Sequence, residues 1–138
     1  MKQPPSPQVS VTPALRVWVL GLACVSVAVG ATLVALGASL ANPWVVVALA
    51  LGSAVAERGT VRLTRTTELT ISPVLMLFAA VLMGPLAGGL VGAASELGEA
   101  ELLDENSGRH PRLKWLTYTS TRFLVGVSMG LVAQMVQT

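Results

Sequence analysis

Residues 73–94 read PVLMLFAAVLMGPLAGGLVGAA and contain no charged side chain. The run of 21 residues from Val74 to Ala94 is long enough to form a membrane-spanning helix. Pro73 lies where the first turn of this helix begins, a position that suits proline. Gly84 and Pro85 fall near the middle of the run, where the proline removes one helical hydrogen bond. We therefore predict a single helix with a hinge at Gly84-Pro85.

Three further apolar runs accompany this one. Residues 17–41 form 25 uncharged residues, enough to cross a bilayer with some tilt. A cleaved signal peptide is the alternative for this run, but its length exceeds the usual apolar core of roughly 7–15 residues. The run from Trp44 to Ala56 has 13 residues, which is short of the roughly 20 that span a bilayer. The short Asn42-Pro43 link predicts that it forms an antiparallel hairpin with the first run. Residues 115–136 form the last apolar run.

The segment from Val61 to Ser72 has a different pattern, because every even position in it is polar. This period of two, with four threonines, indicates a strand-like segment at a membrane surface. The predicted fold is therefore an all-α membrane protein with about four transmembrane or half-spanning helices and a short strand-like interfacial segment. Residues 1–13, with four prolines, form a predicted disordered tail, and residues 14–138 a single helical membrane domain.

The composition excludes several functional classes. Residues of the AVILMFWYC set make up 53% of the 138 residues, and only 12% are charged, which is about half the share of a typical soluble domain. The net charge of +2, without a basic run, excludes nucleic acid as a main partner. One cysteine, Cys24, and one histidine, His110, leave no intrachain disulfide and no two-histidine metal site. We find no paired nucleophile and base, and predict no catalytic residue, metal or cofactor.

Glycines recur at every fourth position in two of the runs. One stripe lies in the third run and another in the last: Gly84, Gly88 and Gly92, then Gly126 and Gly130. Such stripes let membrane helices approach closely. Glu96 extends the first stripe by one step, and Arg122 precedes the second by one step. We therefore predict that the stripes face each other and end in a Glu96–Arg122 pair, the alternative being an Arg122 that snorkels to the surface.

Several stretches resemble a known family. They are Glu57-Arg58, residues 68–73 (ELTISP), residues 82–89 (LMGPLAGG) and residues 111–116 (PRLKWL). Together they resemble the membrane-embedded N-terminal sensor region of bacterial signalling proteins that carry HD-GYP or GGDEF output domains. The resemblance covers roughly residues 44–136. It implies a role in sensing or signalling within a membrane.

The Gly-Pro helix followed by GGLVG and Glu96 is also similar to substrate-binding subunits of energy-coupling-factor vitamin transporters. In those subunits a polar loop ahead of such a helix lines the vitamin pocket, and about six helices are usual, more than this chain has room for. The resemblance implies a ligand site whose candidate residues are Glu68, Thr70, Ser72, Glu96 and Arg122. Glu101 and Glu105 are one helical turn apart, a spacing that suits a hard cation such as calcium or magnesium, but a solvated charged helix end explains the same residues.

The leading functional hypothesis is thus an integral membrane sensor or scaffold without catalytic activity, and the alternative is a minimal vitamin-type transport subunit. Its expected partners are the lipid bilayer, a second copy or a membrane or cytoplasmic protein, and a small-molecule ligand. With four spans, the flanking cations divide five to three between the two sides. This division predicts a multi-pass protein of the cell membrane with both termini in the cytoplasm.

Overall fold

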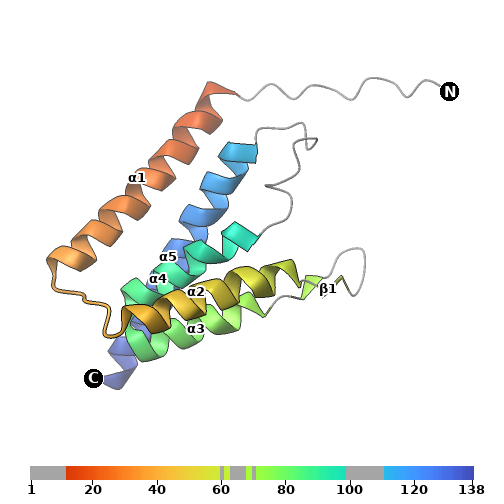
Figure 1. Cartoon of the computed structure of the whole chain (residues 1–138). Coiled ribbons are helices and arrows are strands. Elements are labelled where there is room, and N and C mark those ends of the chain that lie inside the picture. The colour runs from red at the N-terminus through yellow and green to blue at the C-terminus, as the bar shows by residue number, and fades with distance from the viewer. Residues whose placement is uncertain (1–11, 60, 63–67, 70, 99–110) are drawn as a thin grey trace.

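The computed structural model describes residues 12–59, 61–62, 68–69, 71–98 and 111–138. The regular elements of the described chain are helices, apart from two very short strands (Figure 1). Its elements are α1 (Pro13–Ala35), α2 (Pro43–Arg58), β1 (Val61–Arg62), β2 (Glu68–Leu69), α3 (Ser72–Met83), α4 (Pro85–Ser95), the 3-10 turn η1 (Glu96–Gly98) and α5 (Pro111–Gln137). Among the described residues, α1 alone is both long enough and apolar enough to cross a membrane by itself. The predicted tail lies outside the described residues, except for its last two positions.

Proline marks the beginning of every α-helix in the described chain. Pro13, Pro43, Pro85 and Pro111 are the first residues of their helices, and Pro73 is the second residue of α3. The first turn of a helix has backbone N–H groups without intrahelical partners, so proline costs nothing there and its fixed φ suits the helix. The sequence pattern therefore fixes where the helices begin.

The predicted single helix over residues 74–94 is wrong, because the chain reverses direction at Gly84. Gly84 has a φ of 92°, a backbone conformation that favours glycine, and Pro85 then begins α4. Past this turn α4 runs back along α3. A Cβ on Gly88 would lie 2.6 Å from the Cβ of Ala80, and one on Gly92 would lie 2.7 Å from the sulfur of Met76. The hinge is thus the tip of a helical hairpin. Each arm, at about 1.5 Å per residue, is only about 16–18 Å long.

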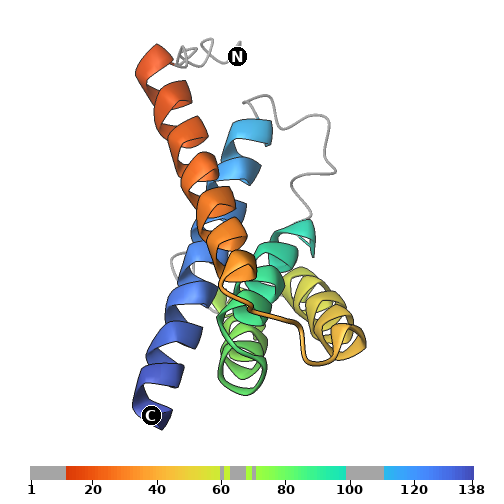
Figure 2. The ribbon, with the colours of Figure 1, turned by 90° about the vertical axis from the view of Figure 1, so that its left-hand side faces the viewer.

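Helix α4 lies at the centre of the bundle, with α2, α3 and α5 packed around it. Helix α1 packs mainly on α5, which it crosses (Figures 1 and 2). The prediction that the first two apolar runs form a hairpin is therefore correct for the chain reversal between them, but the two helices do not pack against each other. Residues 36–42 reverse the chain, yet α1 and α2 diverge instead of packing along their lengths. α1 packs instead on the last helix of the chain, α5, where it contacts Ser120 and Phe123.

The strand-like segment is described only in part, because residues 63–67 and 70 lie outside the described residues. β1 and β2 pair antiparallel, with Val61 opposite Leu69 and Arg62 opposite Glu68. Within the described residues the alternating segment forms two paired strands of two residues each, and Ser72 belongs to α3.

Candidate functional site: an arginine cluster between the helices

Arg122 is the centre of a polar cluster inside the bundle. Its Nε donates to Oε1 of Glu96 at 2.7 Å, and its Nη2 donates to Oε1 of Glu57 at 2.8 Å. The side chain of Glu96 is 3% exposed and that of Glu57 14% exposed. One guanidinium therefore holds two carboxylates that come from different elements, η1 and α2. The planar fork of arginine allows this, because its N–H groups point in several directions at once.

Three buried serines complete the cluster. Nη1 of Arg122 donates to Oγ of Ser95 at 3.1 Å and to Oγ of Ser72 at 3.2 Å. Ser72 also shares a hydrogen bond of 2.9 Å with Ser53, and the Ser95 hydroxyl donates to the Gly92 carbonyl. All three serines are at most 1% exposed. In a low-dielectric interior such polar groups are stable only when they are satisfied, as they are here.

The cluster forms where four helices meet end to side. α2 ends at Arg58, α3 begins at Ser72, α4 ends at Ser95, and α5 passes this point with Arg122. Glycine permits the close approach: a Cβ on Gly92 would lie 2.7 Å from the Arg122 carbonyl oxygen. Gly98, likewise, lies directly against the backbone of Ala54, which brings Glu96 up to α2. The close approach at Gly92 and Gly98 thus brings Arg122 and Glu96 into the cluster.

The structure brings together three of the five predicted ligand residues, Ser72, Glu96 and Arg122. Thr70 and the side chain of Glu68 lie outside the described residues, as do the acidic residues 99–105 and His110. The Glu96–Arg122 pair is formed as the two stripes predict, and the Arg122 side chain, 26% exposed, is turned toward Glu57 and Glu96. Sequence reasoning missed Glu57, Ser53 and Ser95. Ser53 and Glu57 are one helical turn apart at the end of an apolar run, and this polar face was the available signal.

The two glycine stripes pack against each other, in antiparallel order. Gly126 lies on the Gly88 carbonyl, and Gly130 lies on the backbone of Pro85. A Cβ on Gly88 would lie 2.8 Å from the Gly126 carbonyl oxygen. Gly84 is the exception among the predicted packing residues. A Cβ there would meet only the Gln134 amide at 3.6 Å, so Gly84 serves the turn and not the packing.

The arrangement favours a structural role for the cluster. The guanidinium donates to two carboxylates and two hydroxyls, so its hydrogen-bonding capacity is used by the protein itself. Two grooves flank α1 where it crosses α5, and both have almost wholly apolar walls. One is lined by residues such as Leu22, Leu77 and Val81, the other by residues such as Val27, Leu90 and Phe123. Neither groove contains a charged side chain.

Comparison with known proteins gives no family to which the chain belongs: no family model, no curated protein and no solved structure matches it significantly.

Proposed function

We propose that this protein is an integral membrane module, a sensor or scaffold without catalytic activity, whose helices are tied together by the Arg122 cluster. The observation that carries the proposal is the inverted distribution of side chains. Twenty-seven large apolar side chains in the described chain are exposed, whereas the buried hydrophobic residues number eight, three of them alanines. The interior instead holds serines, glycines and Glu96. A bundle with small and polar residues inside and large apolar ones outside is suited to lipid.

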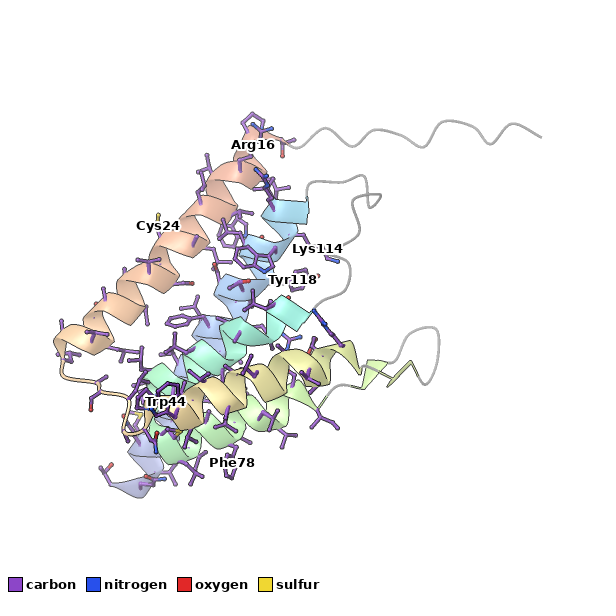
Figure 3. All side chains as sticks on the ribbon, in the orientation of Figure 1. Arg16, Cys24, Trp44, Phe78, Lys114 and Tyr118 are labelled. Atoms are coloured by element: carbon purple, nitrogen blue, oxygen red, sulfur yellow. The ribbon has the colours of Figure 1, made fainter. Side chains whose placement is uncertain are left out.

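The aromatic residues support this placement. Trp18, Trp115 and Tyr118 lie near the beginnings of α1 and α5, and Trp44 lies at the beginning of α2. Figure 3 shows Tyr118 toward one end of the bundle and Trp44 toward the other. Tryptophan and tyrosine gather at the two interfaces of a membrane, where one side of the ring is apolar and the other wet. The two groups therefore mark the two surfaces of the proposed membrane segment.

In a sensor or scaffold of this kind, Arg122 is the link between distant helices. α5 and α2 lie on opposite sides of the α3–α4 hairpin, and Arg122 reaches Glu57 past Ser72 and Ser95. A displacement of α5 is therefore transmitted to the ends of α2, α3 and α4 at once. The two grooves beside α1 have apolar walls, so they do not favour the transport alternative.

The orientation follows from the reversal at Gly84. With α3 and α4 as separate arms, α1 begins at one end of the bundle and α5 finishes at the other (Figure 1). Residues 36–42, Gly84-Pro85 and the end of α5 share the second end and carry no charge, whereas residues 2–16, 57–68 and 96–114 hold every charge except Arg122. Cytoplasmic loops carry the excess of lysine and arginine. We therefore place the start of α1 in the cytoplasm and the end of α5 on the opposite side.

Association with the membrane is tested by fractionation of cells that express the full chain. We expect the protein to stay in the membrane pellet after extraction with alkaline carbonate and to enter solution only with detergent. A peripheral protein is released by carbonate, because that treatment removes proteins held by charge. Recovery of the chain in the carbonate supernatant would contradict the proposed function.

Orientation is tested by single cysteines in a Cys24→Ser background. Thr12→Cys and Gly59→Cys probe one end of the bundle, and Ser39→Cys and Gln137→Cys probe the other. With a membrane-impermeant thiol reagent on intact cells, we expect Ser39→Cys and Gln137→Cys to react, and the other two to react only after permeabilisation. Equal behaviour of Thr12→Cys and Gln137→Cys would restore the even number of crossings that the sequence alone predicts.

A further inference from the structure

The larger of the two grooves beside α1 lies where this helix crosses α5 and faces α4 (Figure 2). We call it the α1 groove. Its volume is about 710 Å³, and its walls are almost wholly apolar, with Val27, Leu90 and Phe123 among them. The α1 wall extends from Ala23 to Ala35, which is about 18 Å by helical rise. Half the hydrocarbon core of a bilayer is about 15 Å thick, so the groove has the length of one leaflet.

Thr119 brings an unsatisfied hydroxyl to this groove. It is one of the lining residues, and its buried Oγ1 has no hydrogen-bond partner among the described residues. The threonines on either side of it in α5 differ. The Thr117 hydroxyl donates to the Leu113 carbonyl and the Thr121 hydroxyl donates to the Thr117 carbonyl, both at 2.8 Å. A buried hydroxyl without a partner costs free energy, which a hydrogen-bonding group that enters the groove would recover.

The hydroxyl of Thr119 can reach such a group without a change in the backbone. Thr119 as a whole is half-buried, although its Oγ1 is covered. A helical threonine populates two χ1 rotamers, because its hydroxyl can bond within the helix or turn away from it. A rotation about this one angle is therefore enough to present the hydroxyl to the groove.

The depth of Thr119 matches the ester region of a phospholipid. Thr119 is four residues after Trp115, about 6 Å further along α5. Tryptophan marks the interface of the membrane, and the ester carbonyls of a glycerophospholipid lie just below its headgroup. Those carbonyls accept hydrogen bonds and cannot donate them, so they suit a hydroxyl donor. From this level the groove continues to Val34 and Ala35, at the uncharged end of the bundle.

We propose that the α1 groove holds one acyl chain of a glycerophospholipid, whose ester carbonyl accepts a hydrogen bond from the Thr119 hydroxyl. The inference rests on the proposed membrane function. The groove offers one polar contact near the interface and apolar contacts along the rest of its length, which is the pattern of an acyl ester. Because the groove has walls from three helices, a chain held in it joins α1 to α4 as well as to α5.

The ester bond allows a direct test, because a dialkyl ether phospholipid can have the same chains and headgroup but no carbonyl. The purified full chain is stripped of lipid in detergent and titrated, in native mass spectrometry, with dioleoyl phosphatidylcholine or with its ether analogue. We expect the ester lipid to bind roughly fivefold more tightly, as for one hydrogen bond between neutral groups. Equal affinities for the two lipids would overturn the proposal.

The hydrogen bond is assigned with a pair of threonine variants. In Thr119→Val a methyl group replaces the hydroxyl at nearly the same volume, so the ratio of the two affinities should fall to one. Thr121→Val is the matched control, since the Thr121 hydroxyl is used within α5 and that residue lines the other groove. It should retain the fivefold ratio. A ratio that Thr119→Val leaves unchanged would overturn the assignment of Thr119.

The place of the acyl chain is tested with a pair of tryptophan variants. Ala31 and Ala28 are both exposed on α1, but only Ala31 lines the α1 groove. We expect Ala31→Trp to abolish measurable binding of both lipids and Ala28→Trp to leave it unchanged. Lipid binding that survives Ala31→Trp overturns the proposal, as does a dimer that Ala31→Trp disrupts, because the groove then holds a second copy. Release of the chain from membranes by alkaline carbonate overturns the membrane function itself, which the ratio of lipid affinities does not test.

Discussion

Replacing Arg122 with methionine is expected to lower the free energy of unfolding by about 3–5 kcal/mol, because it leaves buried carboxylates without their cation. Glu96 is 3% exposed and accepts from Arg122 at 2.7 Å. Methionine keeps much of the apolar stem of arginine, so the loss comes from the charge and its hydrogen bonds. The measurement is the unfolding of the purified protein in mixed micelles with increasing denaturing detergent.

Arg112→Met is the matched control, since Arg112 is exposed on the same helix. Its expected effect is within about 0.5 kcal/mol, as for most surface substitutions. Arg122→Lys keeps the charge but not the fork, and should recover only part of the loss. Adding Glu96→Gln to Arg122→Met should also recover part of the lost free energy of unfolding, because it removes a buried charge that has lost the Arg122 guanidinium. A loss no larger than that of Arg112→Met would show that the cluster does not hold the bundle together.

How far the sequence predicts this cluster can be traced through its members. The Glu96–Arg122 pair follows from sequence, because both residues continue a four-residue glycine spacing and helical geometry brings such stripes face to face. The place of Glu57 in the cluster cannot be predicted from the sequence in the same way. It lies after a short apolar run whose packing partner depends on the position of α4, and the sequence does not state which helix lies beside α2. The serines are small polar residues whose burial becomes visible only with the fold.

The reversal at Gly84 shows a different limit. A Gly-Pro pair inside an apolar run fits a kinked helix and also fits the end of one helix and the start of the next. The positive φ of Gly84 decides between them, and packing across the hairpin maintains it, with Gly88 on Ala80 and Gly92 on Met76. These contacts join residues on the two sides of the same run. A prediction that takes the run as one helix cannot contain them.

This one error also changes the expected orientation. A kinked helix counts as one crossing and gives four, which places both termini on one side. A hairpin counts as two arms and places the start of α1 and the end of α5 at opposite ends. The charge pattern agrees with the second arrangement. The segments at the uncharged end of the bundle contain no lysine or arginine, so all the flanking cations belong to segments at the other end.

Gly126→Ala is expected to destabilise the protein by about 1–3 kcal/mol, the usual cost of forcing an extra methyl group into a packed interior. The new Cβ would overlap the Gly88 carbonyl, which is backbone and has no rotamer by which to move aside. Gly126→Leu should cost more, because α4 and α5 would have to separate along their whole contact. The same titration with denaturing detergent measures both variants.

Gly21→Ala is the control that separates packing from composition. Gly21 lies within α1, and a Cβ there would meet nothing within 4 Å. Alanine forms helix better than glycine by about 0.5–1 kcal/mol, so this variant should be as stable as the original protein or more stable. The two glycines are both in long apolar helices, and an Ala/Gly-rich composition accounts for both equally well. Changes of opposite sign in the free energy of unfolding would therefore assign Gly126 to a close helix contact. Equal changes for the two substitutions would mean that the stripe is a product of composition alone.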